Sequence, residues 1–188
     1  MKVAITGHSK GIGQAISAWM TDHGHVVQGF SRSNGYDIGL DSTLDRILQE
    51  SANVDIFINN AYVDMQQTKL LYMFHEAWLN KQKTIVNIGS CRTQRLDHTH
   101  FQRPTYPRYY VASKASLDYG CKELWNYSAW PRVMLIKPCG TATPRAANYP
   151  VPDLVTPSDM ADLICSAIFE TRCRVQELNF DINSSHVN

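Results

Sequence analysis

The sequence has no long apolar run, no excess of charge of either sign and no low-complexity segment. Its 188 residues carry 18 Lys and Arg against 17 Asp and Glu, which gives a net charge of +1. This balance provides no electrostatic reason to expect nucleic acid or an anionic membrane surface as a partner. No stretch approaches the roughly 20 apolar residues that a membrane-spanning helix requires, so we expect no membrane partner either.

Paired cysteines are also absent. The five cysteines are an odd number and none belongs to a C-x-x-C motif: Cys91, Cys121, Cys139, Cys165 and Cys173. The first residues already have the pattern of a strand, so we expect no cleaved leader. We interpret the cysteines as reduced packing residues of a cytoplasmic protein. His98 and His100 have no Cys or carboxylate at ligand spacing, so we predict no metal site.

Segments of strand length alternate with segments of helical periodicity along almost the whole chain. The predicted strands cover residues 2–6, 25–30, 54–59, 84–89, 132–137 and 177–182. The predicted helices cover residues 11–22, 42–51, 66–81, 109–127 and 158–170, the last with Ser158 as its N-cap. This order predicts an α/β fold, with one domain over residues 1–188 and a doubly wound parallel sheet that helices cover on both faces.

A glycine-rich turn follows the first predicted strand and opens the first predicted helix. It reads Thr-Gly-His-Ser-Lys-Gly-Ile-Gly over residues 6–13. Glycines let the backbone approach a pyrophosphate, and the helix N-terminus supplies free N–H donors, so this arrangement is typical of an anion site. Taken alone, the same turn could be a tight connection that binds nothing.

A tyrosine and a lysine four residues apart, Tyr110 and Lys114, lie on one face of a predicted helix. A tyrosine with a pKa of about 10 is a poor base at neutral pH, and lowering that value by about three units takes roughly 4 kcal/mol. A neighbouring ammonium acts in that direction. Ser90 follows the strand predicted at 84–89, at the sheet edge where α/β proteins bind ligands. Each residue alone could equally be a packing or surface residue.

The two motifs in this order resemble those of the short-chain dehydrogenases/reductases. The glycine spacing is TGxxxGxG rather than GxGxxG, and Tyr110 with Lys114 forms YxxxK. The likeness covers nearly the whole chain and implies a Rossmann-like domain. It also implies that Tyr110 is the acid/base, that Lys114 tunes it and holds the nicotinamide ribose, and that Ser90 orients the substrate carbonyl.

Two further segments resemble motifs of the same family. Residues 59–62 resemble NNAG, with Tyr62 in place of the glycine, and residues 138–143 resemble PGxxxT, with Cys139 in place of the glycine. A side chain at position 62 would be strained if the backbone there required a glycine conformation. The residues that the resemblance assigns to the cofactor are Gly7, Ser9, Lys10, Gly11, Ile12, Gly13, Ser31, Arg32, Ser33, Asp37, Asn60, Ala61, Tyr110, Lys114, Pro138 and Thr143.

The end of the second predicted strand favours NADP(H) over NAD(H). Enzymes that use NAD commonly place an acid there to hold the ribose 2′-hydroxyl, whereas this chain has Ser31, Arg32 and Ser33. The Arg32 guanidinium can form a forked contact with a 2′-phosphate, and Lys10 stands where NADP-using members of the family carry a second cation. The alternative is that both cations are ordinary solvated surface residues.

The chain departs from the family pattern near the expected fourth catalytic residue. Where such members carry an asparagine, this chain has residues 64–67, Asp-Met-Gln-Gln, so we expect water or Gln66 to substitute in the proton relay. Little sequence separates Thr143 from Ser158, so we also expect the family's substrate-covering helices to be reduced and the site to be open.

The segment between Ser90 and Tyr110 is rich in cationic and histidine residues. It contains one acid, Asp97, against Arg92, Arg95, His98, His100, Arg103 and Arg108. This composition suits an anionic carbonyl substrate, although a solvated loop is the plainer interpretation. Two predicted helices also carry apolar residues at helical spacing: Leu70, Phe74 and Trp78 on one, Leu117 and Trp125 on the other. The resemblance implies that dimers and tetramers form through these two helices. Apolar stripes of this kind more often belong to the core.

These observations predict an NADP(H)-dependent oxidoreductase that interconverts a carbonyl and an alcohol on a small molecule, as a homodimer or homotetramer. A cofactor-binding regulator without useful catalysis is the alternative. The extended-branch epimerases are disfavoured because the chain is too short for their substrate domain, and the enoyl reductases because their tyrosine and lysine are more widely spaced.

Overall fold

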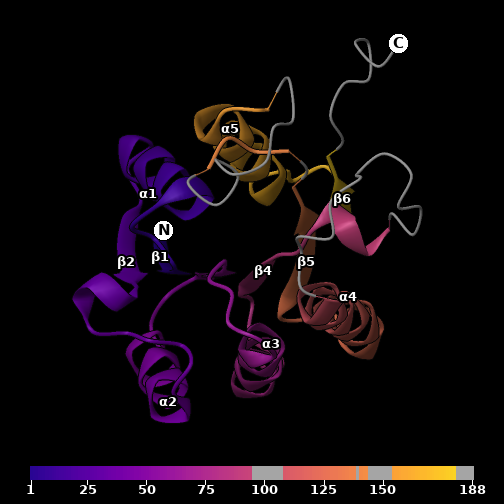
Figure 1. Cartoon of the computed structure of the whole chain (residues 1–188). Helices are drawn as coiled ribbons and strands as arrows, with labels where there is room; N and C mark the ends of the chain where they lie inside the picture. Colours follow the sequence, from indigo (N-terminus) through magenta and orange to yellow (C-terminus); the bar gives the residue numbers. More distant parts are fainter. Residues whose placement is uncertain (95–107, 139, 144–153, 181–188) are drawn as a thin grey trace.

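Six parallel strands form the centre of the protein (Figure 1). The structure is a computed structural model that describes residues 1–94, 108–138, 140–143 and 154–180. In chain order the strands are β1 (Lys2–Thr6), β2 (Val26–Phe30), β3 (Ile56–Asn59), β4 (Thr84–Ile88), β5 (Arg132–Lys137) and β6 (Glu177–Asn179). Their order in the sheet is β2-β1-β3-β4-β5-β6, so the chain reverses direction across the sheet between β1 and β3.

Helices cover both faces of this sheet (Figure 1). They are α1 (Gly11–Asp22), α2 (Asp41–Glu50), α3 (Gln66–Ala77), α4 (Arg108–Tyr127) and α5 (Pro157–Ile168). Helices α1 and α5 lie on one face, and α2, α3 and α4 lie on the other. The doubly wound parallel sheet predicted from the alternation of elements is therefore confirmed. Within the described residues, no helix combines the length and the apolar character that crossing a membrane requires.

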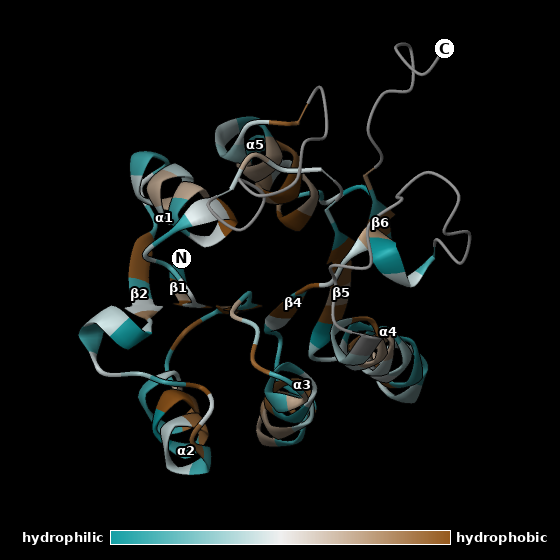
Figure 2. Ribbon diagram, viewed as in Figure 1, coloured by the Kyte–Doolittle hydropathy of each residue, from teal (hydrophilic) through white to brown (hydrophobic). Residues whose placement is uncertain are grey.

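Successive side chains of each strand point to opposite faces of the sheet, so the core has two layers. Val3 and Ile5 of β1 pack with the α1/α5 layer, whereas Ala4 between them packs with the α2/α3/α4 layer. Because successive side chains of a strand point to opposite faces, a strand buried on both sides must be apolar throughout. Figure 2 shows the result, with brown apolar positions of the helices turned toward the sheet.

The apolar stripe of α3 belongs to this core. Leu70 and Phe74 are fully buried and Trp78 is 2% exposed. The Phe74 ring stacks on Phe57 of β3, with ring centroids 3.6 Å apart. Leu117 of α4 joins the same layer. The core interpretation of these positions is therefore the correct one.

Of the four cysteines that the structure describes, Cys173 is exposed and three are buried, as expected for packing residues: Cys91, Cys121 and Cys165. Burial, with a smaller contribution from the charge of Asp162, raises the pKa of the Cys165 thiol to about 12. Burial also raises the pKa of Cys121 well above its ordinary value. These thiols therefore stay protonated at neutral pH and behave as small apolar side chains.

The predicted end of the third helix is wrong by one turn. Helix α3 ends at Ala77 rather than at residue 81. Asn80 has a φ of 62°, and its backbone N–H donates to the carbonyl oxygen of Trp130 at 3.2 Å. Asparagine tolerates this left-handed conformation, which stops a helix. A contact with a distant segment thus ends α3.

The predicted cap of the last helix is also wrong. Helix α5 begins at Pro157, and its N-cap is Thr156, whose hydroxyl accepts from the backbone N–H of Asp159 at 3.1 Å. Proline suits the first helical position because its missing N–H has no partner there in any helix. Ser158 consequently lies inside the first turn.

Replacing Thr156 by alanine is expected to lower the free energy of unfolding by about 1 kcal/mol, because the N–H of Asp159 loses its acceptor. The matched change Ser158→Ala is expected to have an effect within about 0.5 kcal/mol. Urea unfolding followed by tryptophan fluorescence measures both values. A larger loss for Ser158→Ala than for Thr156→Ala would contradict the assignment of the cap.

Candidate functional site

The predicted site residues follow the ends of the parallel strands. Gly7 follows β1, Ser31 follows β2, Asn60 follows β3, Ser90 comes two residues after β4, and Pro138 follows β5. Since carboxyl ends of parallel strands lie on one edge of the sheet, the topology brings these segments together. The candidate site is this edge, with α4 bringing Tyr110 and Lys114 to it.

The glycine turn after β1 leaves no room for side chains. Gly7 and Gly11 have φ values of 71° and 58°. A Cβ on Gly13 would lie 2.3 Å from the carbonyl oxygen of Gly7 and 2.5 Å from Nδ2 of Asn60. Helix α1 begins at Gly11, and its N-cap, Lys10, provides no side-chain hydrogen bond. Uncapped N–H groups behind a close-packed glycine turn fit the pyrophosphate of a dinucleotide.

Residues 60 and 61 brace this turn. The Thr6 hydroxyl accepts from the backbone N–H groups of Asn60 and Ala61, at 3.0 Å each. Asn60 Nδ2 donates to the carbonyl oxygen of Thr6 at 2.9 Å. The NNA part of the motif therefore ties the end of β3 to the end of β1 and holds the glycine turn in its conformation.

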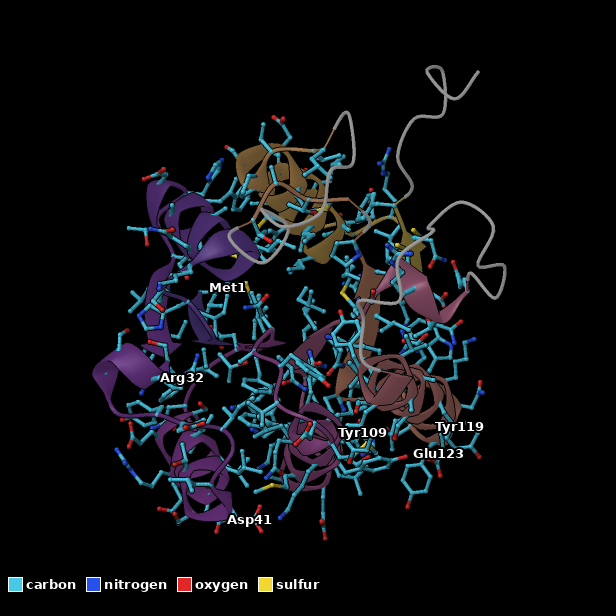
Figure 3. All side chains as sticks on the ribbon, viewed as in Figure 1. Met1, Arg32, Asp41, Tyr109, Tyr119 and Glu123 are labelled. Atoms are coloured by element: carbon cyan, nitrogen blue, oxygen red, sulfur yellow. The ribbon has the colours of Figure 1, made fainter. Side chains whose placement is uncertain are left out.

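The serine and arginine residues expected at a 2′-phosphate lie next to the glycine turn. The backbone N–H of Gly7 donates to the carbonyl oxygen of Phe30 at 2.6 Å, directly before Ser31. The hydroxyl oxygens of Ser31 and Ser33 are 2.7 Å apart. Arg32, at the start of a short 3-10 turn (Arg32–Asn34), is exposed at the edge of the molecule (Figure 3). The tight turn thus places two serines and an exposed arginine in three consecutive residues beside the glycine turn.

His8 is a residue of this region that the sequence reasoning missed. A Cβ on Gly29 would lie 2.3 Å from Cγ of His8, so the imidazole occupies the space over that glycine. Its Nδ1 is buried and has no hydrogen-bond partner. The glycine at position 29 of β2 was the signal in the sequence for this contact, because a side chain at that position would occupy the space that the His8 ring takes.

The other predicted cofactor residues take varied positions. Lys10 is exposed, Ser9 is half-buried, and Ile12 packs against the core layer of α1 and α5. Asp37 accepts from the backbone N–H of Gly39 at 2.9 Å, so its carboxylate shapes the turn that leads to α2.

The segment after β5 reaches the glycine turn. Thr143 Cγ2 would lie 3.2 Å from a Cβ on Gly11, so this threonine lies directly against the turn. Thr141 forms an isolated parallel bridge with Val155, which brings together the two described ends of this segment. The carbonyl oxygen of Pro138 accepts from the backbone N–H of Cys91 at 3.4 Å.

Lys114 is buried at the end of β4. Its side chain is one of the few buried charges of the protein, and the residue is 3% exposed. Its Nζ donates to the carbonyl oxygen of Ile88 at 2.7 Å and to Oε1 of Gln67 at 2.8 Å. These two hydrogen bonds, to a side-chain amide and to a backbone carbonyl, tie the ammonium to α3 and to the end of β4.

Two phenol rings flank this ammonium. Nζ of Lys114 is 5.8 Å from the centre of the Tyr110 ring and 5.4 Å from that of Tyr62. The two rings meet edge to face, with centroids 4.8 Å apart and planes at 72°. Tyr62 is therefore a second site residue, and its φ is not among the positive values. The strain expected from replacing glycine at this position does not arise.

Ser90 is buried at the start of a 3-10 turn, η2 (Cys91–Thr93), and is 7% exposed. Its Oγ accepts from the backbone N–H of Arg92 at 3.3 Å. The serine hydroxyl keeps its own proton for another acceptor in this arrangement. The contact between Lys114 and Ile88 brings α4 to the same strand end from which Ser90 follows.

Gln67, and not Gln66, supports the lysine. Its Nε2 donates to the carbonyl oxygens of Asn59 and Ile88, at 2.6 and 2.9 Å, while its Oε1 accepts from Lys114. Gln66 turns outward, where its Nε2 lies 3.2 Å from Asp41 Oδ1. The prediction that Gln66 substitutes in the proton relay is therefore wrong. Helical periodicity could have distinguished the two, because the buried positions Leu70, Leu71 and Phe74 share a face with residue 67.

Several residues of the cationic segment fall outside the described residues, so their predicted role is not tested: Arg95, Asp97, His98, His100 and Arg103. The same holds for Cys139. Within the part of the chain that the structure describes, no group of three or more His, Cys, Asp or Glu side chains is arranged to hold a metal ion.

No protein-family model and no curated protein sequence matches the chain. Solved structures do match. The 3-alpha-hydroxysteroid dehydrogenase from Pseudomonas sp. B-0831, complexed with NADH, has a TM-score of 0.78 and 17% identity, over 96% of this chain and 94% of that one. A short chain dehydrogenase from Burkholderia cenocepacia J2315, in complex with NADP, has a TM-score of 0.79 and 18% identity, over 96% and 87%.

The chain has the short-chain dehydrogenase/reductase fold. The fold expected from the motifs is thereby confirmed. A further match with this fold, at a TM-score of 0.76 and 17% identity over 97% and 91%, is named ribose-5-phosphate isomerase from Brucella melitensis 16M. Structures with this fold are named for different activities, so the fold alone does not identify the reaction.

Replacing Gln67 by methionine is expected to lower the free energy of unfolding by about 3 kcal/mol, since it leaves a buried ammonium and two buried carbonyls short of partners. Gln66→Met, on the exposed face of the same helix, is expected to change it by less than about 0.5 kcal/mol. Urea unfolding measures both variants. Equal effects at the two positions would show that the Gln67 network does not stabilise the site edge.

Proposed function

We propose that the protein is a member of the short-chain dehydrogenase/reductase family and an NAD(P)-dependent oxidoreductase that interconverts a carbonyl and an alcohol on a small molecule. The observation that carries the proposal is the burial of the Lys114 ammonium beside the ring of Tyr110. Burying a charge costs free energy, so its retention next to a phenol indicates a chemical task.

In this mechanism Tyr110 transfers the proton. During reduction its hydroxyl gives a proton to the substrate oxygen, and during oxidation the phenolate takes that proton back. The positive charge of Lys114 favours the phenolate form in both directions. The edge-to-face contact with Tyr62 restricts the orientation of the Tyr110 ring, so the hydroxyl meets the substrate in one geometry.

Ser90 holds the substrate oxygen in the same scheme. Its Oγ already accepts from the N–H of Arg92, which leaves its proton to be donated to a carbonyl. A bound nicotinamide would supply or accept the hydride at the substrate carbon. The residues that would hold it are those of the glycine turn, with Asn60 and Ala61 bracing the turn and Thr143 lying against it.

Tyr110→Phe is expected to lower turnover by roughly 10²–10⁴-fold, because the proton donor is lost, while the Kd for the nicotinamide cofactor stays close to that of the unmodified protein. Tyr109→Phe is the matched control, since Tyr109 is the adjacent residue and is exposed. The assay is oxidation of NADPH, with NADH in parallel, against ketones, aldehydes and phosphorylated carbonyls.

Undiminished turnover in Tyr110→Phe would contradict the mechanism. Tight NADPH binding with no turnover on the panel would instead support the second candidate, a cofactor-binding regulator of the same fold. The observation that favours this candidate is Tyr62, whose ring takes space beside Tyr110 where the family pattern has a glycine.

We further propose that NADP(H) is preferred over NAD(H). The support is Arg32, which lies in sequence between Ser31 and Ser33 next to the glycine turn, and the exposed Lys10 at the start of α1. A guanidinium and an ammonium suit a phosphate monoester better than a ribose hydroxyl.

Arg32→Ala is expected to raise the Kd for NADPH by roughly tenfold or more, since a charge-assisted contact is lost, and to leave the Kd for NADH nearly unchanged. Lys10→Ala should act in the same direction. Arg46→Ala, at another exposed arginine, is the control. Fluorescence titration with each cofactor measures the effect, and tighter binding of NADH than NADPH by the unmodified protein would contradict the preference.

We propose an anionic carbonyl substrate, a cytoplasmic location, one domain over residues 1–188 with no metal, and assembly into a homodimer or homotetramer. Exposed aromatic side chains on α3 and α4 support the assembly: Tyr72 and Tyr119 lie on these helices, and Figure 3 shows Tyr119 and Glu123 on the outer side of α4.

A further inference from the structure

We propose that a buried ionic cluster beneath the Ser90 turn, formed by Asp118, Lys137 and Glu177, positions Ser90 through the hydroxyl of Thr93. Thr93 is then a positioning residue of the site. The inference rests on the proposed function, in which Ser90 orients the substrate oxygen, and adds a device that this mechanism does not itself contain.

The cluster joins three elements of the fold. Lys137, the last residue of β5, is 1% exposed. Its Nζ lies 2.8 Å from Oδ2 of Asp118 on α4 and 2.8 Å from Oε1 of Glu177 on β6. Burial by itself would lower the pKa of Lys137, but hydrogen bonds to the two carboxylates outweigh burial and raise it. The lysine therefore remains an ammonium through the neutral range.

The two carboxylates share one buried ammonium, so they need further donors, and Lys122 Nζ lies 3.8 Å from Oε2 of Glu177. Glu177 also accepts from Nδ2 of Asn179 at 3.0 Å. Asp118 accepts from the hydroxyl of Thr93 at 2.5 Å, a length typical of a hydrogen bond from a hydroxyl to a charged carboxylate. The other oxygen of Asp118, Oδ1, is buried and has no hydrogen-bond partner among the described residues. Thr93 is thus a main support of an under-satisfied buried carboxylate.

Thr93 in turn belongs to the turn that begins at Ser90. Its backbone N–H donates to the carbonyl oxygen of Ser90 at 3.3 Å, and its Oγ1 lies 3.0 Å from the same oxygen. Ser90 Oγ accepts from the next N–H, that of Arg92. Fixing the Thr93 side chain therefore fixes the turn, and with it the direction of the serine hydroxyl.

The chain that enters the turn rests on the same cluster. A Cβ on Gly89 would lie 3.3 Å from Oδ1 of Asp118, 3.3 Å from Cγ of Lys137 and 2.9 Å from Cδ1 of Leu135. Gly89 also donates its backbone N–H to the carbonyl oxygen of Ile136 at 2.7 Å. Ser90 is therefore held from both sides, by Gly89 before it and by Thr93 after it.

Asp118 connects the ionic cluster to the helix that carries Tyr110 and Lys114. Tyr110, Lys114 and Asp118 follow one another at intervals of four residues, on one face of α4. The carboxylate that holds Thr93 is therefore part of the same rigid element as the acid/base pair. A buried ionic group is a poor means of gaining stability, but a charged acceptor at a fixed place can set the distance from Ser90 to Tyr110.

Thr93→Val removes the hydroxyl at nearly constant shape, and Thr93→Ser restores it. We expect Thr93→Val to lower kcat by about ten- to a hundredfold with little change in the Kd of the cofactor, and Thr93→Ser to recover most of that loss. In a Ser90→Ala background, Thr93→Val should cause little further loss, because the group that it positions is gone.

Equal losses for valine and serine, or an undiminished effect of Thr93→Val in the Ser90→Ala background, would overturn the proposal. Crystal structures of the two Thr93 variants test it without turnover. We expect Ser90 Oγ to shift relative to Tyr110 by more than about 0.5 Å in the valine variant and not in the serine variant. An unmoved Ser90 in the valine variant would overturn the proposal even if the reductase function holds, whereas full activity of Ser90→Ala and Tyr110→Phe would overturn that function alone.

Discussion

A buried ammonium must be surrounded by acceptors, and the packing around the site edge depends on how Lys114 meets this demand. Its two neutral acceptors come from the end of β4 and from α3. Gln67, which supplies one of them, also donates to the ends of β3 and β4. One polar network therefore fixes two strands and two helices relative to one another, and Tyr110, one turn before the lysine, takes its place as a consequence.

A second buried lysine at the same edge is held in a different way. Lys137 lies between two carboxylates, Asp118 and Glu177, which neutralise it. Lys114 donates to an amide oxygen and a backbone carbonyl, and its ammonium lies 5.4 and 5.8 Å from the centres of two phenol rings. Electrostatic interactions extend further in a poorly solvated interior, and this difference between the two lysines separates a chemical role from a positioning role.

The sequence predicted the elements well because they are local. The glycine turn, the YxxxK pair and the strand-helix alternation depend on residues close to one another in the chain, and the parallel sheet followed from their order. Two of the misassigned features depend on distant contacts, whereas the cap of α5 was misplaced within a local turn. Helix α3 ends where Asn80 meets Trp130, and Gln67 rather than Gln66 supports the lysine because it faces the strand ends.

By itself the sequence determined the fold class, the order of the elements and the residue types available for chemistry, because hydrophobic period and turn-forming residues act over short stretches of chain. Only the tertiary structure decided that Tyr62 lies against Tyr110, that His8 covers Gly29, and that Asp118 joins Thr93 to Lys137. These contacts join residues remote in the sequence, and they exist because a parallel sheet brings its carboxyl ends to one edge, where buried polar groups must find partners.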